Sequence, residues 1–321
     1  MRLGRGPNLP RFPLSIAHPL GPCFRQLPIA LRRHLLYLNT HNRWGNFTQP
    51  RRFTEKIQWR IINDKRALIA LACDKLASKA LVASRWKAAG VGDRFKTPEL
   101  YWVGTTHDEF LANISNLPER FVLKPNHTSG RFVVVDRKSD LIDAALIGPL
   151  MKQWMLPDEE TLVMGHWGYS QARRVLFAEE RIRIEVESPV DLRFFTNRGA
   201  IVAAACTGTR SDGSKWTATY DADFGRRVSG HPAQLPLDAI TPLSGLSPSL
   251  ADELRSAIHL VSAEFDQVRV DMYRAGDTFY FGEFTVYSSS GLVKYNDETD
   301  FRLGDAWELP ELTRSANSDP G

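Results

Sequence analysis

The alternation of apolar and polar residues divides the chain into a helical first third and a strand-rich remainder. Helical spacing covers residues 29–38, 53–63 and 66–89, and Gly90 follows the last of these segments. Beyond Pro98 the apolar residues occur in short runs that are typical of strands. The pattern also predicts one later helix, and the expected strands and helix are 121–124, 132–135, 175–178, 182–186, 192–196, 200–205, 268–273, 278–285 and 247–264.

This order of segments predicts an α+β fold with segregated sheets rather than a doubly wound parallel sheet. No G-x-G-x-x-G opens a helix, and no G-x-x-x-x-G-K-[ST] is present. The sequence therefore gives no support to a Rossmann or a P-loop nucleotide site.

Charge is distributed unevenly along the chain. The 321 residues carry a net charge of +4, but residues 1–66 hold 13 Lys and Arg against two acids, which leaves 28 basic and 35 acidic residues in the remainder. We expect the N-terminal part to meet an anion such as phosphate, an acidic polysaccharide or a lipid surface, unless it is a basic arm without a dedicated partner. Residues 27–38 form a short amphipathic pattern with Arg32 and Arg33 on one side, which fits either a packed helix or one lying on a membrane.

Cysteine usage and hydropathy indicate a cytoplasmic protein. Cys23, Cys73 and Cys206 are scattered and lack metal-ligand spacing. No stretch approaches the roughly 18 apolar residues of a spanning helix. We therefore expect a cytoplasmic location, and leave open a peripheral contact at the inner face of the cell membrane through the basic N-terminal region.

A candidate phosphate loop lies at residues 120–131, which read R-F-V-L-K-P-N-H-T-S-G-R. Lys124 ends an apolar strand and is followed by a small polar loop that contains Gly130. Loop N–H groups and a lysine ammonium suit a triphosphate, although a plain hairpin turn has the same pattern.

A second candidate lies at residues 268–285, where two alternating strands flank a short loop. A three-residue loop at 275–277 would place Asp271 and Glu283 diagonally on one face, with Arg269 opposite Glu283. Two neighbouring carboxylates suit Mg²⁺ bridged to nucleotide phosphates. The alternative is a cross-strand ion pair between Arg269 and Glu283.

Several segments, in order along the chain, carry a resemblance to a known family. They are R-F-T-E-K-I-Q-W-R (52–60), D-K-L-A-S-K (74–79), L-P-E-R-F-V-L-K-P-N-H-T-S-G (117–130), F-A-E-E (177–180), D-L-R-F-F-T-N-R-G (191–199), V-R-V-D-M-Y (268–273), F-Y-F-G-E-F-T (279–285) and S-G-L (290–292). Together they resemble the ATP-grasp superfamily, and closely its TupA-like branch, over about residues 50–305.

The resemblance implies an ATP-grasp fold, in which two β-rich lobes clasp ATP, preceded by a helical N-terminal region. We expect a basic arm with a short helix at 1–50 and a helical pre-grasp region at 51–97. The small lobe is expected at 98–180, the large lobe with its Mg²⁺ site at 181–310, and a tail at 311–321.

The resemblance also implies roles for individual residues. Arg193 and Arg269 are the expected catalytic residues, which hold the γ-phosphate or an acyl phosphate. Thr285 stands where most ATP-grasp enzymes have Asn, which leaves a second Mg²⁺ open. The expected ATP-binding residues are Lys75, Lys124, His127, Ser129, Gly130, Glu179 and Glu180, with the two glutamates at the hinge between the lobes, and the expected Mg²⁺ ligands are Asp271, Glu283 and Thr285.

The activity implied is that of a ligase that activates a carboxylate with Mg·ATP and joins it to an amine. TupA-like proteins are associated with cell-surface polysaccharide synthesis, so the implied substrate is a uronic-acid glycan or an amino acid. A kinase acting on a hydroxyl, a non-catalytic nucleotide sensor, and a metal-dependent glycosyltransferase that uses Asp221 and Asp223 are the alternatives. No basic and aromatic stripe of nucleic-acid type is present. The polar stretch 207–230 is interpreted as a loop.

Overall fold

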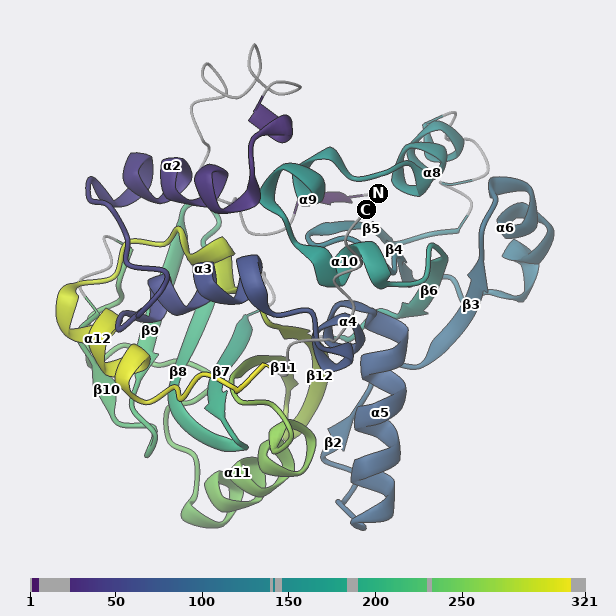
Figure 1. The fold of residues 1–321 in the computed structure, drawn as a ribbon. Coiled ribbons are helices and arrows are strands. Elements are labelled where there is room, and N and C mark those ends of the chain that lie inside the picture. Colours follow the sequence, from purple (N-terminus) through teal and green to yellow (C-terminus); the bar gives the residue numbers. More distant parts are fainter. Residues whose placement is uncertain are drawn as a thin grey trace.

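The computed structural model describes residues 2–5, 24–138, 141, 146–183, 190–229 and 233–312. Within these residues the strands form two sheets, and helices surround both of them (Figure 1). The two sheets define a small and a large lobe.

The small lobe is built on an antiparallel sheet with the strand order β1-β5-β4-β6-β3. Its core consists of apolar side chains from the sheet and from the helices that cover it, with Phe110, Phe121 and Leu123 fully buried. The strands are β1 (Arg2–Arg5), β3 (Leu100–Gly104), β4 (Phe121–Pro125), β5 (Arg131–Val135) and β6 (Leu176–Glu180). The helices that contribute to this core are α6 (His107–Asn113), η1 (Ile114–Asn116) and α8 (Ile147–Met155). Helices α9 (Glu159–Met164) and α10 (Trp167–Gln171) follow them in the chain, and α10 packs on α4 (Ala67–Cys73) beside the core of the large lobe.

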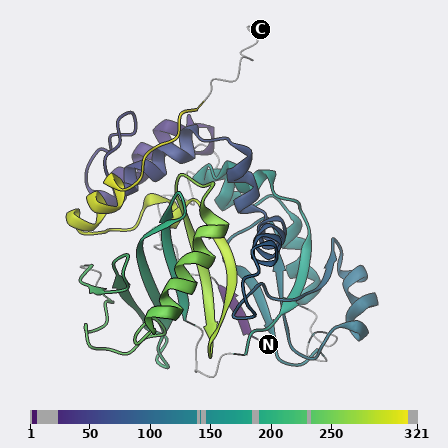
Figure 2. The ribbon, with the colours of Figure 1, turned by 90° about the horizontal axis from the view of Figure 1, so that it is seen from below.

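The large lobe is built on a sheet with the order β10-β9-β8-β7-β11-β12-β2, antiparallel except between β12 and β2. Strand alternation sends Val268, Val270 and Met272 into the core, where all three are fully buried. The strands are β2 (Phe95–Lys96), β7 (Asp191–Asn197), β8 (Ala200–Thr209), β9 (Lys215–Tyr220), β10 (Arg226–Arg227), β11 (Val268–Ala275) and β12 (Thr278–Thr285). Helix α11 (Pro248–Ser262) lies along the sheet (Figure 2).

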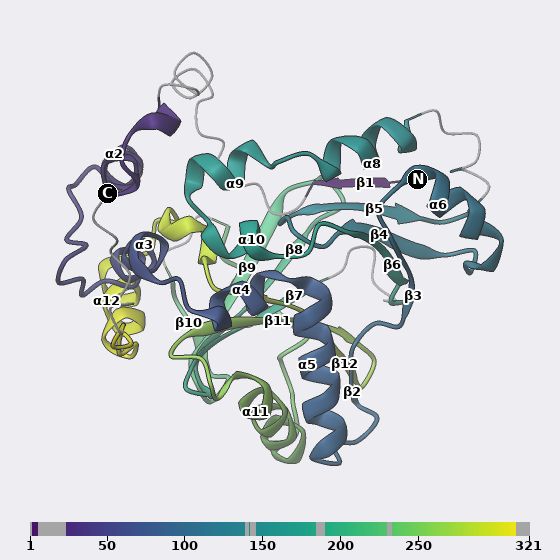
Figure 3. The same ribbon diagram turned by 45° about the vertical axis from the view of Figure 1, so that its right-hand side comes forward.

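The helical N-terminal region packs on the large lobe and shares its core. Helix α5 runs beside β12 and β2, with α11 next to it (Figure 3). The Trp86 indole N–H of α5 donates to the Ala257 carbonyl of α11 at 2.9 Å. The remaining helices are α2 (Ile29–His41), α3 (Phe53–Asn63), α4 (Ala67–Cys73), α5 (Lys75–Ala88), η2 (Ser288–Gly291) and α12 (Asp297–Asp305).

Most predicted segments agree with the structure, and three do not. The helix predicted at 66–89 is two helices, because the Asp74 side chain accepts the N–H of Ala77 at 2.8 Å and starts a new helix. The stretch 207–230 is not a loop throughout, since β8 continues to Thr209 and is followed by β9 and β10. Of the strand predicted at 182–186, only residues 182 and 183 lie within the described residues, and neither is in a strand.

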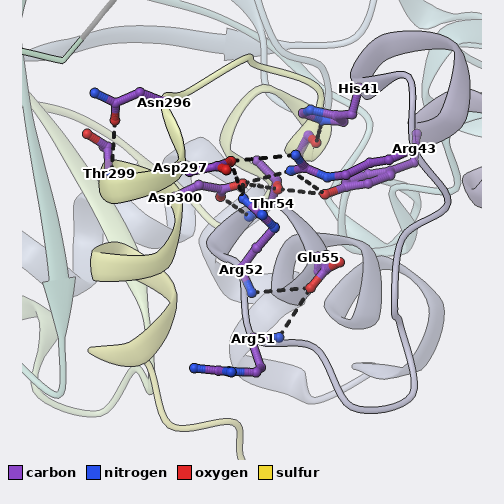
Figure 4. Close-up of polar contacts among 12 residues, drawn as sticks. His41, Arg43, Arg51, Arg52, Thr54, Glu55, Asn296, Asp297, Thr299 and Asp300 are labelled. Atoms are coloured by element: carbon purple, nitrogen blue, oxygen red, sulfur yellow. Dashed lines mark hydrogen bonds and ion pairs between the residues drawn. The ribbon is translucent and has the colours of Figure 1, made fainter.

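Among the described residues, five cations of the N-terminal region form ion pairs with acids from the rest of the chain, namely Arg25, Arg43, Arg52, Arg60 and Arg66. Asp266 accepts from both Arg60 and Arg66 at 2.6 Å. Arg52 and Arg43 point toward the start of α12, where Arg52 contacts Asp297 at 2.6 Å and Arg43 contacts Asp300 at 3.3 Å (Figure 4). Part of the charge asymmetry is therefore balanced inside the molecule, by acids that lie far away in the sequence.

Helix α2 turns its arginines inward and its leucines outward. Arg32 donates to the carbonyls of Leu162 and Val163, while Arg33 is fully buried and donates to Gln58 at 2.6 Å. Leu31, Leu35 and Leu38 are each about 40% exposed. Helix α2 is thus packed on the protein through its arginines, which agrees with the first of the two predicted alternatives, a packed helix. None of the helices in the described part of the chain is long and apolar enough to cross a bilayer.

Candidate active site

Three charged side chains lie next to one another across neighbouring strands of the large sheet. Asp271 of β11 is directly opposite Glu283 of β12 on one side and Arg193 of β7 on the other. Directly opposed residues of antiparallel strands project from the same face. We refer to Arg193, Asp271 and Glu283 as the Asp271 row.

The register that creates this row differs from the predicted one. The hairpin loop has two residues, Gly276 and Asp277, so that Ala275 pairs with Thr278. The register then shifts between Asp271 and Met272 at a β-bulge, which leaves Gly282 unpaired. The two carboxylates are consequently directly opposed rather than diagonal, and Arg269 is opposite Thr285 rather than Glu283.

The Asp271 carboxylate is held by a guanidinium and a hydroxyl. Arg269 donates to both of its oxygens at 2.6 Å, and the Thr285 hydroxyl donates to Oδ2 at 3.0 Å. Burial alone would lower the pKa of Arg269, but the Asp271 carboxylate raises it above its ordinary value. Arg269 therefore stays charged, and it supplies the positive charge that stabilises Asp271.

The Glu283 carboxylate faces a lysine of the N-terminal region. Lys75, the first residue of α5, places its ammonium 3.6 Å from Glu283 Oε2 and also donates to the Thr128 carbonyl of the small lobe. It also lies 5.6 Å from the centre of the Tyr169 ring. Lys75 thus connects the predicted phosphate loop to a predicted metal carboxylate.

Lys124, which the resemblance predicts to bind ATP, is paired with a buried glutamate. Lys124 contacts Glu179 Oε1 at 2.5 Å, and Lys79 contacts Oε2 of the same carboxylate at 3.1 Å. Burial alone would raise the pKa of Glu179, but the two ammonium groups hold it below its ordinary value. Glu179 is 2% exposed, and its carboxylate thus forms ion pairs with both lysines.

The loop that follows Lys124 begins with two buried residues and ends with Ser129 and Gly130. Asn126 and His127 are buried: Asn126 accepts the N–H of Leu76 at 2.9 Å, and a ring nitrogen of His127 contacts the Trp154 carbonyl at 3.0 Å. Burial lowers the pKa of His127, so the ring is neutral at pH 7. Ser129 hydrogen-bonds with Tyr169, and Gly130 has a φ of 70°, which favours glycine.

Glu180 ends β6 and lies beside the segment that leads into β3. Its N–H donates to the Glu99 carbonyl at 2.8 Å, and its carboxylate accepts the N–H of Glu99 at 3.2 Å. The next described residues, 181–183, leave the small lobe toward β7. Glu180 is therefore at the connection between the lobes.

Arg193 has a carboxylate neighbour on its own strand. Its guanidinium donates to Asp191 Oδ2 at 3.1 Å, and its Nε is buried without a hydrogen-bond partner among the described residues. A buried donor without a partner is costly unless a ligand or water satisfies it. Arg193 therefore retains donor capacity beside the two carboxylates of the Asp271 row.

Asp221 and Asp223, the two residues of the glycosyltransferase alternative, lie in a turn after β9. Asp221 accepts the N–H groups of Asp223 and Gly225 at 3.0 and 2.8 Å and contacts Arg227 at 3.0 Å. The side chain of Asp223 is 93% exposed. Asp221 thus closes the turn with its own carboxylate, whereas the Asp223 carboxylate is exposed and lies 3.7 Å from Arg255.

Two charged residues of the site were not predicted from the sequence. Lys79 lies one helical turn beyond Lys75, so an i, i+4 pair at the start of α5 was the available signal. Asp191 lies two residues before Arg193 on β7, and strand alternation places both on one face.

The donor groups fit a magnesium ion held jointly with nucleotide phosphates. Asp271, Glu283 and Thr285 offer oxygen atoms only, which is what Mg²⁺ prefers. Among the described residues, no three His, Cys, Asp or Glu side chains converge on one point. A site with two carboxylates leaves coordination positions for phosphate oxygens and water, as Mg²⁺ sites commonly do.

The family described as TupA-like ATPgrasp matches residues 55–308, which is most of the chain. The protein therefore belongs to the TupA-like ATP-grasp family, and its two-lobed architecture is an ATP-grasp fold. A comparison with curated proteins gives no match.

Solved structures similar to this chain are distant in sequence. D-alanine–D-alanine ligase from Bacillus anthracis in complex with ATP has 15% identity and a TM-score of 0.39, over 67% of this chain and 55% of that one. N5-carboxyaminoimidazole ribonucleotide synthetase from Thermus thermophilus has 14% identity and a TM-score of 0.38, over 67% and 45%. The ATP-grasp ligase PsnB with a precursor variant, Mg and ADP has 12% identity and a TM-score of 0.40, over 79% and 65%. The chain thus spans about half to two thirds of the length of these proteins.

Proposed function

We propose that this protein is an ATP-dependent ligase that joins a carboxylate to an amine. The observation that carries the proposal is that Lys75, whose ammonium contacts the Thr128 carbonyl of the small lobe, also lies 3.6 Å from Glu283, which is directly opposite Asp271 in the large sheet. Lys124 of the small lobe and Lys75 of α5 suit the phosphates of ATP, and Asp271 and Glu283 of the large lobe suit Mg²⁺. Bound Mg²⁺ would neutralise charge on the transferring phosphoryl group.

The protein's own groups can account for the first half of the reaction. An oxygen of the substrate carboxylate attacks the γ-phosphorus of ATP, the bond to ADP breaks, and an acyl phosphate forms. Arg193 has unused donors beside the Asp271 row and stabilises the charge of the phosphoryl group. Lys124 must exchange its contact with Glu179 for one with phosphate, and Lys79 remains to neutralise Glu179.

The second half forms the amide. The nitrogen of a neutral amine attacks the acyl carbon, the C–O bond to phosphate breaks, and phosphate leaves with the electron pair. Closure of the two lobes excludes water, which would otherwise hydrolyse the acyl phosphate.

The substrate proposed is a uronic-acid glycan or an amino acid in cell-surface polysaccharide synthesis, and this follows from the family resemblance alone. The basic N-terminal region gives it little support, because many of its cations are paired internally. A cytoplasmic location is supported by Cys73 and Cys206, which are free thiols among the described residues.

The experiment that tests the proposal is thermal unfolding with Mg·ATP, with Mg·UDP-sugars and without nucleotide. A ligand at 100 times its Kd stabilises the folded state by about 2.7 kcal/mol. We expect stabilisation by Mg·ATP, its loss in Asp271→Asn, and its retention in the exposed control Asp223→Asn. Stabilisation by UDP-sugars alone would refute the proposal and favour the glycosyltransferase alternative.

A kinase would use the same phosphate-binding groups, so the product must decide between the two reactions. Hydroxylamine converts an acyl phosphate into a hydroxamate but leaves a phosphate ester unchanged. We expect hydroxamate when the enzyme is incubated with Mg·ATP, hydroxylamine and glucuronate or glutamate. Phosphorylated sugar without hydroxamate would favour the kinase.

A further inference from the structure

A second row of polar side chains crosses the large sheet beside the Asp271 row. Each member is directly opposite the next on strands β11, β7, β8 and β9, so all of them project from the face that carries Asp271. We call it the Asp191 row, and its members are Tyr273, Asp191, Thr207 and Thr217.

The Asp191 row has hydrogen-bonding capacity that the protein leaves unused. The hydroxyl of Thr207 is buried and has no partner among the described residues. Within the same residues, Arg193 is the ion-pair partner of Asp191, and it contacts Oδ2 at 3.1 Å. Because an unpaired buried hydroxyl costs free energy, the row suits a polar ligand better than an apolar one.

The opposite side of the Asp271 row offers no such place. There Phe195 lies opposite Arg269, is buried, and packs on the ring of Phe53 with centroids 5.8 Å apart. A second substrate that approaches the Asp271 row along this face of the sheet therefore meets the Asp191 row.

The spacing of the two rows matches the geometry of amide formation. Residues two apart on a strand are separated by about 6.6 Å. A group bound by Asp191 thus lies about 6.6 Å from a phosphoryl group bound beside Arg193. Reacting atoms must approach to about 3–3.5 Å, which a small molecule lying across both rows achieves.

We propose that the Asp191 row is the acceptor subsite and that it takes a primary amine carrying hydroxyl groups, such as an amino sugar. Asp191 binds the ammonium and accepts one proton from it, which gives the neutral amine that attacks the acyl phosphate. The second proton passes from the nitrogen to the departing phosphate as the C–N bond forms and the C–O bond breaks. Tyr273, Thr207 and Thr217 bind the hydroxyl groups of the acceptor. This assignment rests on the proposed ligase function.

The test is calorimetric titration of glucosamine into the 321-residue chain saturated with Mg²⁺ and a non-hydrolysable ATP analogue. We expect glucosamine to bind, N-acetylglucosamine, which has no ammonium, to fail, and Asp191→Asn to weaken binding about tenfold or more. Thr207→Val should weaken it several-fold. Asp238→Asn and Thr209→Val, which are exposed positions outside the row, are the matched controls.

The outcomes separate this inference from the function on which it rests. Unchanged affinity in Asp191→Asn, or no binding of glucosamine to the wild type while Mg·ATP still stabilises the protein, would overturn the acceptor subsite alone. Loss of the Mg·ATP effect as well would overturn the ligase proposal. Equal binding of N-acetylglucosamine would exclude Asp191 as the ammonium partner.

Discussion

The pairing of Glu179 with two lysines makes a quantitative prediction about stability. Glu179→Gln keeps the shape of the side chain but leaves Lys79 and Lys124 beside a neutral amide in a buried place. Removing one partner of a buried ion pair costs about 3–5 kcal/mol. Lys124 keeps a side chain that is 22% exposed and can turn toward water, so we expect the lower end, about 3 kcal/mol.

The assay is urea unfolding at pH 7 and at decreasing pH. The folded-state pKa of Glu179 is below its ordinary value of 4.5, so its contribution is present above that pH and is lost as the pH falls through the folded pKa. The stability difference between the wild type and Glu179→Gln should therefore shrink in acid. Replacing Lys79 by Met in the same variant removes one unpaired charge and should restore part of the loss.

A neighbouring residue provides the control. Glu180 is partly exposed and accepts one N–H, so Glu180→Gln should cost less than about 1 kcal/mol. A loss below about 1 kcal/mol in Glu179→Gln would refute the view that this carboxylate is the buried counter-ion of both lysines.

The same variant tests what Glu179 does for the nucleotide. The resemblance assigned Glu179 to ATP binding at the hinge between the lobes, whereas its carboxylate lies between two lysines. If it serves as their counter-ion, Mg·ATP should bind Glu179→Gln at least as tightly as the wild type, because Lys124 no longer gives up a partner. A large loss of affinity in a variant that remains folded would support direct contact with the nucleotide.

Three further predictions follow from single positions. A Cβ at Gly282 would lie 3.0 Å from the Asp271 carbonyl oxygen, so Gly282→Ala should disturb the bulge and reduce the Mg·ATP shift in Tm, whereas Gly92→Ala, where a Cβ would meet nothing within 4 Å, should not. Burial lowers the pKa of His166 from 6.5 to about 3, so the free energy of unfolding of the wild type should decrease as the pH falls from about 6.5 to 3, by up to about 1.4 kcal/mol per pH unit. His166→Gln should show a shallower decrease, and an equal slope would contradict this. A Cβ at Gly304 would lie 2.0 Å from the Arg51 carbonyl oxygen, so Gly304→Ala should separate α12 from α3 and lower stability by more than about 2 kcal/mol in urea unfolding.

The sequence alone determined which residues of β11 face the core and which face the site. Strand alternation assigned Val268, Val270 and Met272 to the core and placed Asp271 on the other face, because side chains of a strand alternate whatever it packs against. The ordered motifs, from Arg52 onward, were enough to indicate the family. These signals are local, and a single sequence contains them.

Tertiary structure decided the contacts between distant segments. The bulge at Gly282 set the register of the Asp271 row, and a hairpin pattern does not encode where an unpaired residue will sit. Lys79 and Glu179 are 100 residues apart, so their pairing was invisible in either motif. The basic N-terminal region looked like a surface for an anion, yet Arg60 pairs with Asp266 in the interior. Charge and periodicity indicate which kinds of group a segment can contact. Only the packed fold decides which group that is, because a buried charge is costly unless an opposite charge is packed beside it.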